Sequence, residues 1–170
     1  GGSTINLGVD AYVPGLYTDP AASAFYGQFT GKLHLRAPRA GTTVNVNSLA
    51  GSILDPSAVI VEGFRVYSPA GGNVNTALRN TMNTDNTTFM TGEAAMRANL
   101  LLGSADPAGL GAALVVAPGV EIINRTGDLL LGTAGNNNGT SPADDWNLAT
   151  FRYGAEGSPG ILTLRAFGNV

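Results

Sequence analysis

Two stretches of this chain recur in similar form, and this internal repeat limits the choice of fold more than any other feature. Residues 32–38, KLHLRAP, recur as residues 161–167, ILTLRAF. A second pair, residues 123–129 and 164–170, is separated by 41 residues. Repeats of tens of residues are typical of solenoids, in which each coil pairs with the next at the strand spacing of about 4.8 Å. The repeat therefore favours a fold built from stacked coils.

The composition favours β-structure with sharp turns. Only 12% of the 170 residues are charged, and the chain contains 24 Gly and 9 Pro. Alternating apolar residues, as in 32–36 and 43–47, are typical of strands. We interpret Pro118 and Gly119 as a turn, and Gly63, inside a third apolar run, as a bend or bulge. We predict an all-β parallel β-helix (a solenoid) with one helical insertion. An antiparallel β-sandwich is the alternative, because it explains the alternation and the turns but not the repeat.

Aliphatic residues at alternate strand positions are expected to stack from coil to coil into one continuous core. The predicted ladder consists of Leu33, Leu35, Val44, Val46, Ile122, Leu129, Leu162 and Leu164.

Changes in composition divide the chain into four segments. We predict an irregular leading segment over 1–30, packed on the stalk, coils over 31–72, a helical insertion over 73–103, and coils over 104–170 that continue further.

The insertion is rich in Ala, Met, Leu and Asn and lacks alternating runs. We expect one helix over 90–102, with Thr91 as its N-cap and Gly103 as its stop, and a shorter helix over 76–82.

Charge and residue usage exclude several kinds of site. The net charge is −3 and the arginines are scattered singly, so no basic face for nucleic acid is expected. No apolar run is long enough for a membrane span. The chain has no Cys and one His, His34, which alternates with Leu33 and Leu35 and should be exposed. We therefore expect no metal and no cofactor.

Several short segments, taken in order, resemble coils of filamentous-haemagglutinin-like bacterial exoproteins of the two-partner secretion family. The resemblance covers roughly residues 30–170, and it rests on residues 35–38, 61–67, 116–122, 127–129, 145–148 and 159–166.

The resemblance implies a right-handed β-helical stalk that is exported through an outer-membrane secretion pore to the bacterial cell surface. It implies a non-enzymatic, structural role in an extracellular adhesin filament, serving adhesion or biofilm formation. It implies no catalytic residues. The expected partners are the secretion pore, a host-cell or matrix glycan, and further copies of the chain by end-to-end self-association.

An acidic and aromatic cluster near the end of the chain suggests an alternative function. Asp144, Asp145, Trp146 and Tyr153 are candidates for contact with carbohydrate, which would make the chain a carbohydrate-binding or polysaccharide-degrading β-helix module. Adjacent residues of an extended chain point to opposite faces, however, so the two carboxylates would not converge without a bend. A plain turn before a strand explains them as well.

A polysaccharide lyase would need clustered acids and a basic catalytic group, whereas the acids here are dispersed. Arg36 and Arg165 occupy equivalent positions of the repeat, which favours an outward-facing structural role for both.

Three methionines of the insertion, Met82, Met90 and Met96, could form an adaptable apolar surface for a partner. Packing of the helices onto the stalk is the alternative explanation.

Overall fold

The structure is a computed structural model that describes residues 4–6, 31–54, 56–131, 146 and 148–170. The predicted irregular leading segment, 1–30, lies outside the described residues except for the short strand β1 (Thr4–Asn6). This strand pairs in parallel with β4 (Ser52–Leu54).

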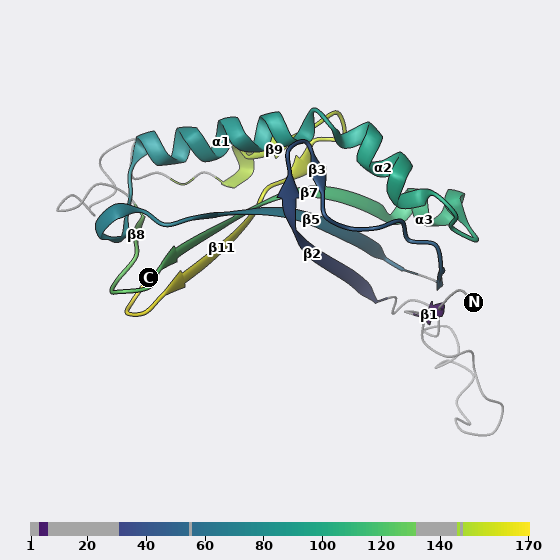
Figure 1. The fold of residues 1–170 in the computed structure, drawn as a ribbon, viewed down its shortest axis with the longest axis horizontal. Coiled ribbons are helices and arrows are strands. Elements are labelled where there is room, and N and C mark those ends of the chain that lie inside the picture. The colour runs from purple at the N-terminus through teal and green to yellow at the C-terminus, as the bar shows by residue number, and fades with distance from the viewer. Residues whose placement is uncertain (1–3, 7–30, 55, 132–145, 147) are drawn as a thin grey trace, which may run out of the picture. The chain divides into compact units, whose positions relative to one another are not determined.

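The largest element is a five-stranded mixed sheet with the strand order β11-β7-β5-β2-β3 (Figure 1). The pair β2–β3 is antiparallel, and the other neighbours are parallel. The strands are β2 (Lys32–Ala40), β3 (Thr43–Val44), β5 (Ala58–Tyr67), β7 (Leu114–Asn124) and β11 (Ile161–Ala166).

Three helices and several short elements complete the fold. The helices are α1 (Thr76–Met90), α2 (Glu93–Leu101) and α3 (Pro107–Ala113). The strand pairs β6 (Asn73–Val74) with β8 (Leu130–Leu131), and β9 (Arg152–Tyr153) with β10 (Ser158–Pro159), are small separate sheets. Two 3₁₀ turns, η2 (Ala70–Gly72) and η3 (Leu148–Thr150), precede β6 and β9 respectively.

This mixed α/β architecture shows that the predicted all-β parallel β-helix is wrong, and so is the alternative antiparallel β-sandwich. The physical reason lies in residues 73–113. They form three helices instead of a single excursion, and α1 buries apolar side chains against the sheet. A helical layer covers a sheet face that a solenoid would cover with strands.

By its internal contacts the chain divides into two compact units. Unit 1 comprises Gly1–Leu35, Val46–Val61 and Arg97–Val115, and unit 2 comprises Arg36–Asn45, Glu62–Met96 and Val116–Val170. The division predicted from composition, with segments 31–72, 73–103 and 104–170, stays a prediction.

In unit 1, Arg97 stabilises the C-terminal end of α3. Its guanidinium donates to the carbonyl oxygens of Gly111, at 2.9 Å, and Leu114, at 2.6 Å. These carbonyls lie at the C-terminal end of the helix, where no intrahelical donor remains. Asp106 caps the other end by accepting from the backbone N–H of Gly109 at 2.9 Å.

The apolar core of unit 2 lies between α1 and the strands. Its buried members are Tyr67, Val74, Met82, Val120, Ile122 and Leu129, and Leu162 and Leu164 are among the partly buried residues packed against them. Four residues of the predicted ladder therefore belong to this cluster. Burial of each large aliphatic side chain contributes about 1.5–3 kcal/mol, so this cluster is the main source of stability in the unit.

The helix α1 runs further than the residues 76–82 that the sequence indicated. Asn75 caps its first turn by accepting from the N–H of Leu78 at 2.9 Å. Residues 83–88 are all Asn, Thr or Asp, which favour helices weakly. The helix continues through them because Met82, Asn86 and Phe89 recur at helical spacing and are buried. The helix is interrupted before Glu93, so α2 begins at Glu93 and not at Met90.

One of the two repeated pairs, residues 123–129 and 164–170, lies side by side, although the fold is not a solenoid. The other pair, residues 32–38 and 161–167, lies in β2 and β11, which β5 and β7 separate. Strand β11 pairs in parallel with β7, with Ile161 opposite Gly119 and Ala166 opposite Asn124. Beyond the strands, the N–H of Asn169 donates to Asp128 Oδ1 at 2.7 Å. These two residues occupy equivalent positions of the 41-residue repeat. The repeat favoured stacked coils of a solenoid, which the mixed sheet contradicts, so the adjacency of these two segments is a finding of the structure.

Two glycines that were interpreted as turn or bend residues lie inside strands. Pro118 and Gly119 are buried within β7, so the predicted turn there is wrong. A Cβ at Gly119 would lie 2.1 Å from Glu62 Oε1, and a Cβ at Gly63 would lie 2.3 Å from Cζ of Phe89. Both positions are glycine because a neighbouring side chain crosses the strand there.

Candidate functional site

A pocket of about 180 Å³ opens in unit 2 between α1 and the segments around β9 and β11. Three of its lining side chains are aromatic, three are amide or guanidinium groups, and the rest are mainly aliphatic. The aromatic side chains are Trp146, Phe151 and Tyr153, and the polar ones are Arg79, Asn83 and Asn86.

The aromatic wall comes from the segment that precedes β11. The ring centroids of Trp146 and Phe151 lie 6.3 Å apart with their planes inclined at 47°. Tyr153 is buried in the β9–β10 hairpin, whose turn contains Gly154 and Gly157 at positive φ. A Cβ at Gly160 would lie 3.0 Å from the Tyr153 ring, so this glycine keeps the ring's edge accessible to the pocket.

The polar wall comes from α1. Asn83 and Asn86 are three residues apart and therefore lie on the same side of the helix. The hydroxyl of Tyr153 donates to Asn83 Oδ1 at 2.9 Å. Burial raises the pKa of Tyr153, and the nearby Asn86 amide offsets part of the rise.

Arg39 of β2 holds the amide of Asn86 in place at the polar wall. Its guanidinium donates to Asn86 Oδ1, and because a guanidinium has no acceptor, the amide oxygen of Asn86 must face it. The same guanidinium donates to the carbonyl oxygens of Gly63 and Gly119, both at 2.8 Å, and lies 4.5 Å from the centroid of the Phe89 ring. One side chain thus joins β2, β5, β7 and α1. Burial lowers the pKa of Arg39.

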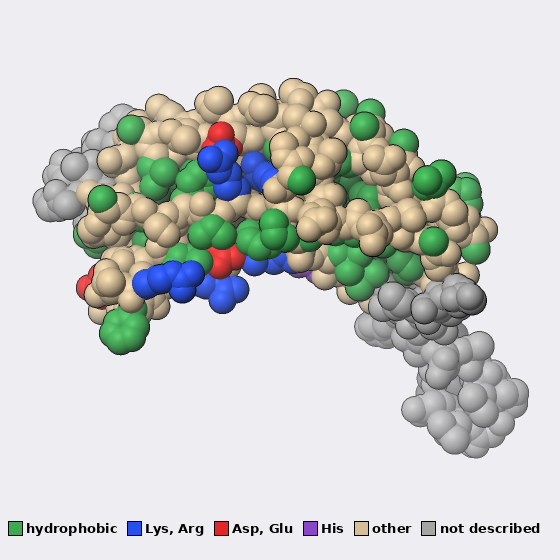
Figure 2. Space-filling view, viewed as in Figure 1, with side chains coloured by type: hydrophobic (Ala, Val, Ile, Leu, Met, Phe, Trp, Pro, Cys, Tyr) green, Lys and Arg blue, Asp and Glu red, His purple; other side chains and the backbone are tan. Residues whose placement is uncertain are grey.

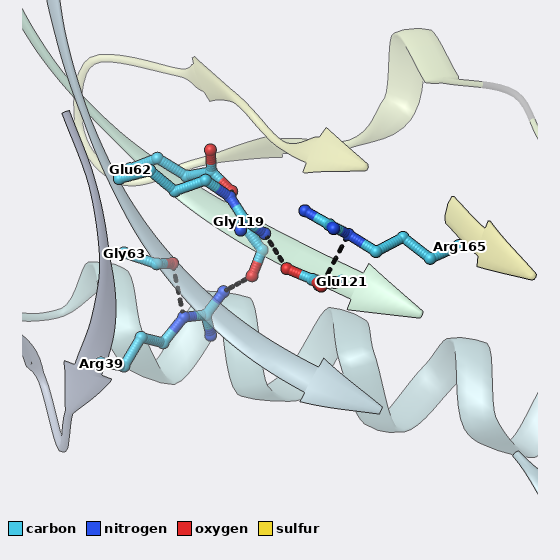
Figure 3. A network of polar contacts seen from close by, with 7 residues as sticks. Arg39, Glu62, Gly63, Gly119, Glu121 and Arg165 are labelled. Carbon is cyan, nitrogen blue, oxygen red and sulfur yellow. Dashed lines mark hydrogen bonds and ion pairs between the residues drawn. The ribbon is translucent and has the colours of Figure 1, made fainter. Parts of the chain in front are cut away.

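On the other face of the same strands, charged side chains alternate across the sheet (Figure 3). We call Arg36, Glu62, Glu121 and Arg165 the cross-strand charge row. Arg36 donates to Glu62 at 3.1 Å and to Glu121 at 2.5 Å, and Arg165 donates to Glu121 at 2.9 Å. Both glutamates are buried, with 0% and 5% of their surface exposed. Arg36 also lies 3.9 Å from the centroid of the Phe64 ring.

The charge row is a structural feature rather than an open site. Each carboxylate is bound by an arginine from a flanking strand, which is how buried charges are tolerated. The space-filling view shows Lys and Arg side chains in blue next to acidic side chains in red on one side of the molecule (Figure 2). The predicted structural role of Arg36 and Arg165 agrees with these contacts, since the two share one carboxylate.

A third group of polar residues lies where β5 ends. The hydroxyl of Tyr67 donates to Asp85 at 2.6 Å, and Arg65 forms an ion pair with the same carboxylate at 2.9 Å. Burial and the bond to Asp85 raise the pKa of Tyr67. These contacts fasten α1 to β5.

The candidate carbohydrate residues divide into two groups. Trp146 and Tyr153 line the same pocket. Asp144 and Asp145 lie outside the described residues. Sequence reasoning missed Arg39, Asn83 and Asn86. A helix over all of 76–90 would have placed the two asparagines on one face, but the sequence indicated only its first half.

The three methionines are buried within the chain. Met82 lines the pocket with 4% of its surface exposed, and Met90 and Met96 are 3% and 1% exposed. Such burial is what packing of the helices requires. Contact of these residues with a partner stays a prediction.

Among the residues that the structure describes, no three His, Cys, Asp or Glu side chains gather into a group that could hold a metal ion. His34 is exposed, as predicted. None of the helices in the described part of the chain is long and apolar enough to cross a membrane.

No protein-family model, curated protein or solved structure matches this chain. The function therefore has to be argued from the pocket and the contacts around it.

Proposed function

We propose that this chain is a carbohydrate-binding segment that holds a single sugar ring in the pocket between α1 and the β9–β11 region. The observation that carries the proposal is the convergence of three aromatic rings with amide and guanidinium groups in one cavity of about 180 Å³.

A sugar ring has the two kinds of surface that this pocket offers. Its C–H face packs against aromatic rings, and its oxygen atoms form hydrogen bonds at the ring edge. The cavity is smaller than the roughly 300–1,000 Å³ that drug-sized ligands occupy, which favours one ring over an extended oligosaccharide. The polar groups are held in place by Arg39 and by one another, so ordering them costs little on binding.

The resemblance of residues 30–170 to filamentous-haemagglutinin-like exoproteins supports an extracellular setting. In that setting the chain would be exported through an outer-membrane pore, and its ligand would be a glycan of a host cell or of the surrounding matrix. Binding without turnover would serve adhesion or biofilm formation.

Trp146 is the only tryptophan of the chain, so its fluorescence reports directly on the pocket. We would titrate the chain with a panel of monosaccharides and follow this emission. Trp146 itself cannot be replaced in that assay, so calorimetry would compare Trp146→Ala with Phe167→Ala, an aromatic control that is 83% exposed and outside the pocket lining. We expect Trp146→Ala to weaken binding by about tenfold, because an aromatic contact is worth about 0.5–1.5 kcal/mol beyond its buried area. The proposal fails if no sugar changes the emission, or if Trp146→Ala binds as tightly as the control.

A structural role in a fibre is a second candidate, favoured by the parallel pairing of β11 with β7. In the sheet order, β11 is an edge strand, and an edge strand can pair with a further strand of another copy. Analytical ultracentrifugation over a wide range of concentrations tests this candidate. Growth into linear assemblies supports it, and a monomer at all concentrations contradicts it.

A further inference from the structure

Strand β11 is an edge of the five-stranded sheet, and its outer side carries unpaired backbone groups. The N–H of Phe167 donates to the carbonyl oxygen of Asn124 at 2.9 Å, so every second residue counted back from Phe167 directs its backbone groups toward β7. Because these groups alternate in direction along a strand, those of Leu162, Leu164 and Ala166 point away from the sheet. Each of these residues offers one donor and one acceptor to a further strand.

The chain itself uses this outer side only at the start of the strand. The N–H of Gly160 donates to the carbonyl oxygen of Phe151 at 3.2 Å. From Leu162 onward, the outward backbone groups form no such bond within the described part of the chain. The open edge therefore runs from Leu162 to the end of β11 at Ala166.

The side chains of β11 divide between two faces of different chemistry. Leu162, Leu164 and Ala166 are partly buried against the apolar core of unit 2. On the opposite face, Arg165 stands at one end of the cross-strand charge row. A strand paired with β11 would continue both faces, with apolar side chains beside the leucines and polar ones beside the arginine. The edge therefore fits a segment in which apolar and polar residues alternate.

The guanidinium of Arg165 has donors left for a second carboxylate. Arg165 reaches across to Glu121 and forms an ion pair through Nε at 2.9 Å, while 62% of its side chain stays exposed (Figure 3). Neither of its terminal nitrogens has a partner among the residues that the structure describes. A guanidinium carries five N–H donors, so one carboxylate does not use them all. A carboxylate on the next strand would thus meet open donors of opposite charge.

We propose that the outer edge of β11 binds an extended acidic segment of a protein partner, which adds a strand to the sheet and places a carboxylate against Arg165. Charge complementarity selects this occupant over a second copy of the strand. Residues 161–166 contain Arg165 and no Asp or Glu, so a paired copy of β11 brings another arginine and no carboxylate. The sugar pocket proposed above is a different site, and pairing at this edge does not require it.

Two short peptides of equal length test the charge. One alternates Val with Glu and the other alternates Val with Lys, and both carry a fluorescent label. Their binding to the full chain would be measured by fluorescence anisotropy. We expect the Val–Glu peptide to bind at least about tenfold more tightly, which corresponds to about 1.4 kcal/mol, because Arg165 attracts the carboxylates and repels the lysines.

A matched pair of variants locates the effect. Arg165→Gln should weaken binding of the Val–Glu peptide by about fivefold, as expected for the loss of one partly exposed ion pair. Lys32→Gln makes the same change in charge at an exposed residue of β2, which β5 and β7 separate from β11, and should leave the affinity unchanged. Circular dichroism of both variants checks that they fold, and the comparison of the two peptides needs no variant.

Methylated peptides test whether the contact is a paired strand. The N–H groups of the Val residues lie along one edge of the extended peptide, and those of the Glu residues lie along the other. Only one edge can pair with β11. N-methylation of one set should therefore abolish binding, and N-methylation of the other set should leave it intact.

Each remaining outcome overturns the inference. It fails if the Val–Glu peptide does not bind, if the Val–Lys peptide binds as tightly, or if both methylated peptides bind equally well. An equal loss of affinity in Lys32→Gln and Arg165→Gln rejects the assignment to Arg165.

A second copy as the true occupant has its own signature. Ala166→Pro removes one outward N–H without removing a bond to β7. Self-association of the wild-type chain that this variant prevents, measured by analytical ultracentrifugation, would assign the edge to another copy and overturn the acidic partner. Absence of sugar binding, in contrast, would overturn the function proposed above and leave this edge site in place.

Discussion

The ring of Phe89 on α1 lies directly against the backbone of Gly63 on β5. A Cβ at Gly63 would stand 2.3 Å from Cζ and 2.9 Å from Cε2 of that ring. This contact sets how closely the helix approaches the sheet. It therefore also sets the position of Asn86, one turn earlier on the helix, which lines the pocket.

Gly63→Ala should destabilise the protein, because the added methyl group forces Phe89 or the helix to move. We expect a loss of about 1–3 kcal/mol in the free energy of unfolding, measured by urea denaturation. The control is Gly111→Ala in α3, where the new Cβ would meet only Leu101 Cδ1 at 3.5 Å. Alanine is the better helix former, so the control should be neutral or stabilising by up to about 1 kcal/mol. Equal stability of Gly63→Ala and the wild type would contradict the close contact.

Arg39→Met should be among the most destabilising single changes in unit 2. It removes the donors to the carbonyl oxygens of Gly63 and Gly119 and to the amide of Asn86, and each buried acceptor left without a partner costs about 1–3 kcal/mol. Arg39→Lys keeps the charge but cannot reach three acceptors at once, so it should fall between Met and the wild type. Thermal and urea unfolding would rank the three proteins. A Lys variant as stable as the wild type would show that the charge, and not the set of three hydrogen bonds, matters at this position.

Removing the buried Glu121 carboxylate and removing the exposed Arg165 at one end of the cross-strand charge row should differ in their cost to stability. Glu121→Gln removes the buried charge that both arginines bind, and we expect a loss of about 3 kcal/mol or more. Arg165→Ala removes a side chain that is 62% exposed, and the loss should stay below about 1 kcal/mol. Free energies of unfolding in urea at low and high salt would compare them. A larger loss for Arg165→Ala than for Glu121→Gln would show that the network depends on its exposed end.

Stability should fall in alkaline solution partly through Tyr67. Burial and the bond to Asp85 raise its pKa in the folded protein above the ordinary value of 10.0. Above that ordinary value the unfolded chain releases the phenol proton while the folded protein keeps it. Stability from this group is therefore complete below about pH 10 and is lost as the pH rises toward the folded pKa.

Tyr67→Phe has no phenol proton at this position, so its stability should decline less steeply above pH 10. It should also be less stable at pH 7, because it lacks the hydrogen bond to Asp85. Urea unfolding midpoints of both proteins from pH 7 to pH 11 would give the stability at pH 7 and its decline above pH 10. Parallel declines of the variant and the wild type would exclude Tyr67 as a contributor.

The strands of this protein could be predicted from local pattern. Alternating apolar residues indicated strands at 32–36 and 161–165, which lie in β2 and β11. This signal is local because successive side chains of a strand point to opposite faces of the sheet. The repeat predicted a solenoid, which is wrong, although residues 123–129 and 164–170 do lie next to each other. Trp146 and Tyr153 stood out because they follow the acidic pair Asp144 and Asp145 in the sequence.

The helical layer over the sheet and the candidate pocket depend on contacts between residues that are far apart in the sequence. Residues 83–88 favour helix weakly by themselves, and they are helical because Met82, Asn86 and Phe89 are buried. The same long-range packing brought Arg39 to Asn86, 47 residues away, and so fixed the amide of Asn86 at the pocket wall. Sequence by itself determined which segments were extended and which residues were apolar, since both are local properties. The tertiary structure alone decided that a helix covers the sheet and which side chains meet, because those outcomes depend on burial energies shared among residues far apart in the chain.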